Sequence, residues 1–434
     1  MIDKTEKSHR SNLTKTGKQR RLLMKGAAAT VAAGTITGAP MIWAQNIKNV
    51  TLRQFGTGVS NLNDVADKVK EDLGFTLEMT ALDSDSVTQR AATQPKSFDI
   101  ADIEYWICKK VWPAGNLQAM DTSRIDNYDR IVGIFRNGKL NPESTIAQGT
   151  APHSVGFVDG PEGKEFVDNE SGWMTLIPTI YNADTLGIRP DLIGRDISTW
   201  AELLNPEFKG KASILDISSI GIMDAAMVCE AMGEISYGDK GNMTREEIDK
   251  TMAIFTEAKK NGQFRAFWKS FDESVNLMSS GEVVIQSMWS PAITAVRAKG
   301  IPCVYQPLKE GYRSWGGGLG LSKNLSGLEL DAAYEYINWY LSGWVGGYLM
   351  RQGYYSAVPE TSKNFMSEDE WGFWFEGKPA QGDIVNPQGV VMEKAGATRD
   401  GGSFEDRMGS VACWNAVMDE NQYMVRKWNE FIAA

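Results

Sequence analysis

Short apolar runs alternate with longer amphipathic stretches along the chain from residue 49 onward. The first stretch places Val65, Val69 and Leu73 on one stripe, which is the spacing of a helix with one buried face. The predicted order is strand, helix, strand, helix, strand, at residues 50–55, 61–73, 75–79, 83–93 and 98–103. This alternation predicts an α/β fold whose parallel sheet has helices on both faces.

A second region of the same character begins near residue 181. Its helix at 245–261 carries Glu246 and Glu247 in the first turn, where the helix dipole favours acidic side chains. The glycine run at 316–320 lacks the Lys-Ser/Thr pair of a phosphate-binding loop, and we interpret it as a tight turn. The other elements predicted here are strands at 212–216 and 283–288 and helices at 199–204 and 222–232. Residues 366–412 are irregular and resemble a wrapping segment.

The ends of the predicted strands carry polar and aromatic side chains. In open α/β sheets, ligands bind beyond the carboxyl ends of the strands. The strand ends at 56–60 and 104–106 make Ser60, Glu104 and Trp106 candidate ligand-binding residues.

Tryptophan is several-fold more frequent than usual, with 14 residues in a chain of 434. Ring faces bind cations through their quadrupole, and they also suit flat apolar ligands or sugars. Glu104 and Asp216 would supply negative charge beside such rings. The rings that we expect to form an aromatic box are Trp106, Trp268, Trp289, Trp315 and Tyr355.

Charge and composition exclude several classes of function. The net charge is −10, and residues 1–44 contribute +6 of it, so the remainder carries −16 and does not suit nucleic acid as a partner. No apolar stretch is long enough to span a membrane. With only His9 and His153 and no nucleophile–base motif, we expect neither an enzyme nor a metal or other cofactor. We interpret the four cysteines as buried free thiols, although one disulfide pair stays open.

Residues 1–44 are typical of an export signal. A basic stretch ends in Arg20-Arg21, a weakly apolar run follows at 27–40, and the small residue Ala44 precedes the first strand. This order resembles a twin-arginine signal peptide, which exports a chain that has already folded. The sequence therefore predicts a periplasmic protein.

The motif WAELLNPEFKG stands at 200–210. It resembles the signature of the spermidine/putrescine-binding group of periplasmic proteins that serve ABC transporters, and weaker matches follow the same order as in that family. The weaker matches are at 98–100, 177–182, 280–290, 315–322 and 353–359. The resemblance implies a type-2 periplasmic binding fold with two interleaved lobes, a ligand cleft between them and clamshell closure.

The resemblance also implies a domain division and partners. Hinges are expected near residues 180, 289 and 322. Lobe 1 would then hold residues 45–180 plus 290–322, and lobe 2 would hold 181–289 plus 323–434. The implied protein is a monomer that captures a small molecule and delivers it to the membrane permease of an ABC transporter, or that serves a sensor instead.

Departures from the family narrow the expected ligand. The stretch at 216–219 offers one acid, Asp216, and Gly316 follows Trp315 where the family has an acid, while Glu104 stands where the family has a serine. An ammonium group buried without a partner is costly, and one end of a long diamine would have no partner here, so we expect a compact organic cation or a cation with an anionic end. Polyamine-like amines, amino-acid-derived amines and methylated ammonium ions belong to this class. Two alternatives remain: a ferric-ion protein using Tyr354 and Tyr355, and a binding protein for a neutral or anionic solute.

Overall fold

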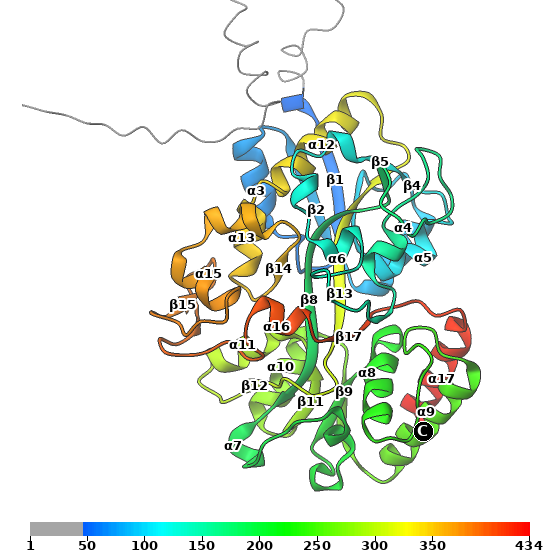
Figure 1. Ribbon diagram of the computed structural model, residues 1–434, viewed down its shortest axis with the longest axis vertical. Coiled ribbons are helices and arrows are strands. Elements are labelled where there is room, and N and C mark those ends of the chain that lie inside the picture. Colours follow the sequence, from blue (N-terminus) through cyan, green and yellow to red (C-terminus); the bar gives the residue numbers. More distant parts are fainter. Residues whose placement is uncertain (1–46) are drawn as a thin grey trace, which may run out of the picture.

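Two lobes make up the molecule, and two long strands run from one to the other (Figure 1). The computed structural model describes residues 47–434, so the predicted signal peptide lies outside the described residues. The connecting strands are β8 (Ile177–Ile188) and β13 (Tyr312–Ser322), which pair antiparallel with each other. The predicted two-lobe α/β architecture is confirmed, and we call the lobe with β1 lobe 1 and the lobe with β9 lobe 2.

Lobe 1 begins with the predicted strand–helix alternation. The first strand pairs in parallel with the second and third, because helices return the chain to the same edge of the sheet each time. Val65 and Val69 are buried on the predicted stripe of α3. The elements are β1 (Thr51–Gly56), α3 (Asn63–Asp72), β2 (Thr76–Ala81), α4 (Ser84–Thr93) and β3 (Ile100–Glu104).

Lobe 2 follows the first crossing and has its own core. The predicted helix at 245–261 is confirmed as α9, and a capping box between Thr244 and Glu247 begins it. The helix α8 is buried on nearly all sides between the sheet, α9 and the last helix. The elements are β9 (Ala212–Leu215), α8 (Ser218–Ala231), α9 (Arg245–Lys260), β10 (Phe264–Trp268), α10 (Phe271–Ser280), β11 (Ile285–Met288) and α11 (Ser290–Ala298).

The strands of each lobe run toward the other lobe. Strand β3 is antiparallel to β13 and therefore runs toward lobe 2, in the same sense as β8. Strand β11 is antiparallel to β8, and β9 and β10 are parallel to β11, so all three run toward lobe 1. The carboxyl ends of both sheets consequently meet in the middle of the molecule, where a ligand would bind.

The glycine run at 316–320 lies inside β13, so the predicted tight turn is wrong. A Cβ on Gly318 would come within 2.9 Å of the Leu176 Cβ, and a Cβ on Gly320 within 2.7 Å of a Leu176 methyl group. These glycines serve close packing of one strand against its neighbours rather than a change of chain direction. Sequence spacing alone does not distinguish the two uses of glycine.

The segments after residue 289 pack in other lobes than predicted. The prediction gave lobe 1 residues 45–180 plus 290–322 and lobe 2 residues 181–289 plus 323–434. Ala292, Ile293 and Val296 of α11 pack in lobe 2 with Met288, because the chain has not yet crossed back. Strand β13 then returns the chain, and α12 (Gly327–Tyr340) and α13 (Trp344–Met350) pack in the core of lobe 1. Helix α17 (Asn421–Ala433) closes the core of lobe 2.

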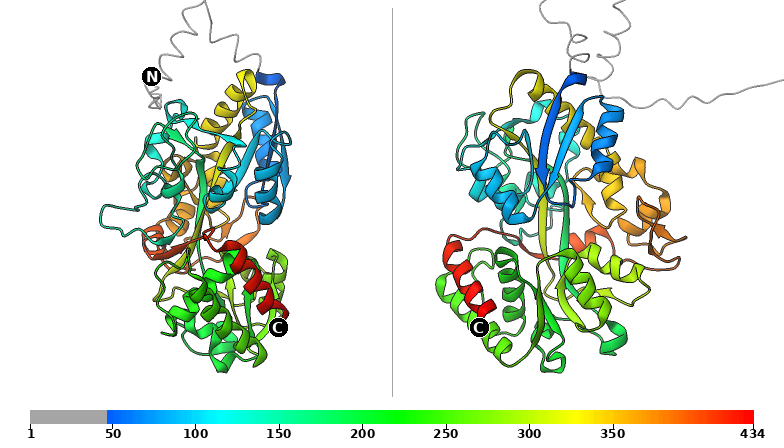
Figure 2. Two further views of the ribbon diagram at one scale, coloured as in Figure 1. Left: turned by 90° about the vertical axis from the view of Figure 1, so that its right-hand side faces the viewer. Right: turned by 180° about the vertical axis from the view of Figure 1, so that it is seen from behind.

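The segment at 366–403 lies along one side and contacts both lobes (Figure 2). Gln388 Nε2 donates to the Tyr348 hydroxyl of α13 at 2.7 Å, whereas Arg297 of α11 donates to Glu393 at 2.6 Å. The predicted wrapping segment thus has regular pieces. These and the elements that follow are α15 (Glu368–Trp374), β15 (Ile384–Val385), β16 (Val391–Glu393), α16 (Phe404–Met408) and β17 (Val411–Trp414).

The four cysteines are buried free thiols, as interpreted from the sequence. Burial raises the pKa of each to about 12, which keeps them protonated and unreactive. Between residues 47 and 434, none of the helices has both the length and the apolar character to cross a bilayer.

Candidate functional site

A narrow cavity of about 20 Å³ lies at the carboxyl ends of β1 and β3, with room for little more than one water molecule. Three predicted ligand-binding residues, Ser60, Glu104 and Trp315, line it together. The crossing strands β8 and β13 supply Ile180 and Gly317 to its wall. The full lining is Thr57, Val59, Ser60, Val87, Asp102, Ile103, Glu104, Ile107, Ile180, Trp315 and Gly317.

Asp102 is a buried carboxylate in this cavity that the sequence interpretation did not single out. Ser60 donates a short hydrogen bond to its Oδ2, and Asn61 Nδ2 donates to the same oxygen at 3.3 Å. Burial raises the pKa of Asp102 to about 7, and the bond from Ser60 only partly opposes this effect. The carboxyl group is therefore poised between its neutral and charged forms near neutral pH.

Glu104 is held in a similar way at the end of β3. Trp106 Nε1 donates to its Oε2 at 2.5 Å, and Asn415 Nδ2 donates to the same oxygen at 3.4 Å. Burial raises the pKa of Glu104 to about 7 as well. Trp106 is itself only 3% exposed and stands behind Glu104, so it orients the carboxylate instead of lining the cavity.

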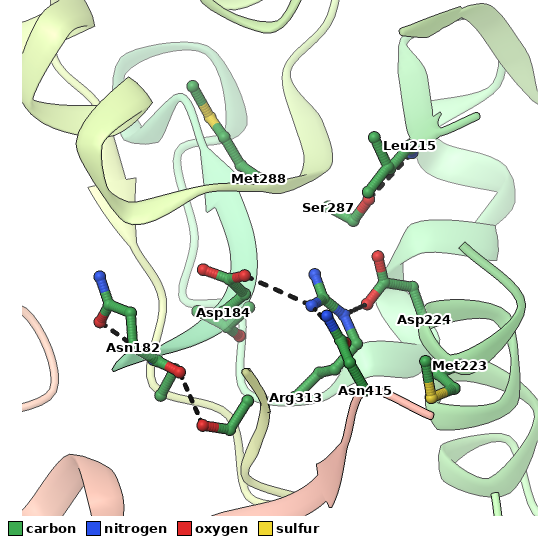
Figure 3. A network of polar contacts seen from close by, with 12 residues as sticks. Asn182, Asp184, Leu215, Met223, Asp224, Ser287, Met288, Arg313 and Asn415 are labelled. Atoms are coloured by element: carbon green, nitrogen blue, oxygen red, sulfur yellow. Dashed lines mark hydrogen bonds and ion pairs between the residues drawn. The ribbon is translucent and has the colours of Figure 1, made fainter. Parts of the chain in front are cut away.

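No Lys, Arg or His is among the residues that line this cavity. The nearest buried cation on the same network is Arg313 of β13, which Figure 3 shows between Asp184 and Asp224. Its guanidinium donates to Asp224 at 2.6 Å and forms an ion pair with Asp184 at 3.3 Å. Asn415 accepts from Arg313 at 3.0 Å and so connects this pair of acids to Glu104. Two carboxylates already balance the charge of Arg313, and it has no positive charge to spare for an anionic ligand.

The predicted residues of lobe 2 gather at the facing edge but already have partners. Asp216 follows β9, accepts from Trp428 Nε1 at 2.7 Å and pairs with Lys269 at 3.2 Å. Trp268 is fully buried and donates from Nε1 to the Ser287 carbonyl at 3.1 Å. Trp289 packs edge-to-face on Trp268, with ring centroids 4.8 Å apart, and is only half-buried.

Tyr354 and Tyr355 are not arranged as a pair that could bind a metal ion. Tyr355 is fully buried against Phe404 and Tyr181 in lobe 1, whereas Tyr354 packs edge-to-face on Trp315. Burial raises the pKa of Tyr354 well above its usual value, which disfavours the phenolate that iron requires. Among residues 47–434 no three His, Cys, Asp or Glu side chains are grouped to hold a metal ion. The ferric alternative is therefore not favoured.

The structure thus brings together only part of the predicted aromatic box. Trp315 lines the cavity, Trp289 is half-buried at the opposite edge, and Trp106, Trp268 and Tyr355 are buried. Sequence reasoning missed Asp102, although its place two residues before Glu104 on one strand puts both side chains on the same face. It also missed Arg313, because no local sequence pattern predicts that this charged side chain is buried.

Residues 64–362 match the family model described as "Bacterial extracellular solute-binding protein". The chain belongs to this family. The match covers more than half of the chain and confirms a binding protein, not an enzyme, located outside the cytoplasm as predicted. The family resemblance inferred from the motif at 200–210 is confirmed as well.

A curated relative is similar in sequence over 56% of this chain. The spermidine/putrescine-binding periplasmic protein of Escherichia coli (strain K12) is 30% identical over 248 residues, covering 56% of this chain and 59% of its own length. The alignment therefore spans less than two thirds of that relative.

Two solved structures extend the likeness to most of the chain. A putative spermidine/putrescine ABC transporter from Listeria monocytogenes has a TM-score of 0.60 at 12% identity, covering 88% of this chain and 98% of its own. A binding protein from A. tumefaciens R10 in complex with agropinic acid has a TM-score of 0.54 at 12% identity, covering 88% and 99%. Because such different ligands occur on one fold, the fold does not identify the ligand.

Proposed function

We propose that this protein is the solute-binding component of an ABC importer and that it captures a small organic cation between its lobes for delivery to a membrane permease. The observation that carries the proposal is the charge of the cavity at the end of β3. Asp102 and Glu104 line it, no basic side chain does, and the nearby Arg313 is already paired with two acids. A cationic group would balance this buried negative charge.

Aromatic side chains on both lobes support the same ligand class. Trp315 lines the cavity beside the two carboxylates, and the half-buried Trp289 lies at the facing edge of lobe 2. A ring face over a cation contributes about 0.5–2 kcal/mol. In this proposal lobe 1 supplies the charge, and closure brings Trp289 over the ligand as a cover.

A thermal-shift screen of the mature protein against amines, amino acids, sugars and carboxylic acids tests the ligand class. We expect organic cations to raise the melting temperature, because a ligand that binds only the folded state stabilises it. Stabilisation by sugars or carboxylic acids without any response to cations would contradict the proposal. Small-angle scattering with the best cation should show a smaller radius of gyration, as clamshell closure requires.

Delivery to a permease needs a separate test. An importer reconstituted from this protein's cognate permease and ATPase should accumulate the cation only when this protein is present. A cation that binds tightly but is not transported under these conditions would favour the sensor alternative.

A further inference from the structure

Asp102 and Glu104 are alike in that hydrogen bonds reach only one oxygen of each carboxylate. The hydrogen bonds from Ser60 and Asn61 both end on Oδ2 of Asp102, and those from Trp106 and Asn415 both end on Oε2 of Glu104. In each case neighbours fix one oxygen and leave the other to the cavity that both residues line. Neither of these second oxygens is among the buried side-chain atoms that lack a hydrogen-bond partner, so each is accessible and can accept a hydrogen bond from a ligand.

The rest of the cavity wall carries no charge. Besides Asp102 and Glu104, its lining consists of aliphatic side chains, the hydroxyl residues Thr57 and Ser60, Trp315 and Gly317. The two carboxylates are therefore the charged groups that a ligand in this cavity would meet.

The wall that a ligand would meet therefore offers two carboxylates and few aromatic rings. Of the five rings predicted to form a box, Trp315 alone lines this cavity. Carboxylate and hydroxyl oxygens accept hydrogen bonds from N–H groups, and such charge-assisted bonds are about twice as strong as neutral ones. A fully methylated ammonium ion has no N–H to donate and depends on several ring faces around it.

Building on the proposed function, we propose that Asp102 is a second ligand-contacting carboxylate of this site and that, with Glu104, it selects cations with N–H donors over fully methylated ammonium ions. The two residues are separated by two positions on β3, which is roughly 6.6 Å along a strand. They can receive N–H groups from two ends of a compact ligand or from two edges of a guanidinium group.

Matched pairs of cations test the selectivity on the wild-type protein. Ethanolamine is compared with choline, and 1,4-diaminobutane with its hexamethylated form, with agmatine as the guanidinium probe. We expect at least one N–H-bearing cation to bind at least tenfold more tightly by calorimetry than its methylated counterpart. Equal or tighter binding of the methylated partner in each pair that binds would overturn the selectivity.

The variant Asp102→Asn tests the residue itself, with the tightest N–H cation from this panel. Asparagine keeps an acceptor for Ser60 and removes the charge, so we expect at least tenfold weaker binding. Glu78→Gln, an exposed carboxylate on β2, is the matched control and should bind like wild type. Binding by Asp102→Asn within twofold of wild type would refute the role of Asp102.

A third variant covers the case in which Asp102→Asn does not fold. Ser60→Ala leaves the charge of Asp102 in place but releases its pinned oxygen, and it should change affinity by severalfold while the preference for N–H cations persists. Loss of that preference would contradict the assignment to the carboxylates. If no cation on the panel binds, the proposed function fails; if cations bind but the variants and pairs show no effect, only this inference fails.

Discussion

The acidic side chains at the two facing edges of the molecule differ in how fully other groups of the protein bond them. On lobe 1, Asp102 and Glu104 each keep one oxygen free toward a shared cavity. On lobe 2, Asp216 is bonded to Trp428 and Lys269, and it anchors the last helix and the loop after β10. The difference indicates that position at a strand end does not by itself make a ligand-binding residue. What matters is whether the protein's own groups already satisfy the side chain.

Glu104→Gln is expected to weaken cation binding more than any other single variant considered in this comparison of the two lobes. The substitution keeps an acceptor for Trp106 but removes a buried charge, and losing one partner of a buried charge pair typically costs about 2–5 kcal/mol. Calorimetry with the best cation from the screen measures the loss directly. Unchanged binding, combined with loss of binding in Trp289→Ala, would instead indicate a neutral or anionic ligand held by stacking.

The second expected effect is a pH dependence that belongs to lobe 1. Burial raises the pKa of Asp102 and Glu104 to about 7, so both carboxyls become neutral as the pH falls below that value. A primary amine stays charged throughout, so affinity should fall by about tenfold per carboxylate for each pH unit below 7. Asp184 and Asp224 also have raised pKa values because of burial, but Arg313 pairs with both. The double variant Asp102→Asn/Glu104→Gln should therefore lose most of the dependence of cation affinity on pH. If its affinity depends on pH as steeply as that of wild type, other groups cause the dependence.

A smaller effect is expected for Trp289 on lobe 2. Removing one ring from a cation typically costs about 0.5–2 kcal/mol, so Trp289→Ala should weaken binding less than Glu104→Gln, and Trp289→Phe less still. The reverse order of affinities in calorimetry would show that lobe 2, not lobe 1, supplies most of the binding free energy.

The smallest effect on affinity is expected for Asp216→Asn. Because Asp216 is already bonded within lobe 2, its loss should leave cation affinity within about twofold. Thermal unfolding should instead show a lower melting temperature, since the Trp428 indole loses a charged acceptor worth about 1.5–3 kcal/mol. Weaker binding at unchanged stability would make Asp216 a ligand-binding residue after all.

The same contrast explains what could be predicted from sequence. The period of apolar positions identified β1, α3, α9 and the strand ends correctly, because local backbone and one buried face decide them. The glycine run of β13 and the packing of α12 depend on neighbours distant in sequence, and both differed from expectation. Ser60 and Glu104 were predicted from their place at strand ends and Trp315 from its aromatic ring, and all three line the cavity. The roles of Asp216, Trp268 and Tyr355 depend on Trp428, Ser287 and Phe404, which no local pattern connects to them.

Counting protons during ligand binding tests the central claim most directly. Near pH 7 the buried carboxyls of Asp102 and Glu104 are each about half protonated, and a bound cation should drive both to the charged form. Calorimetric titrations at pH 7 in two buffers of different ionisation enthalpy measure the protons released. The account predicts release of about one proton by wild type and about half as much by Glu104→Gln. Tight cation binding with no proton release in wild type would contradict it.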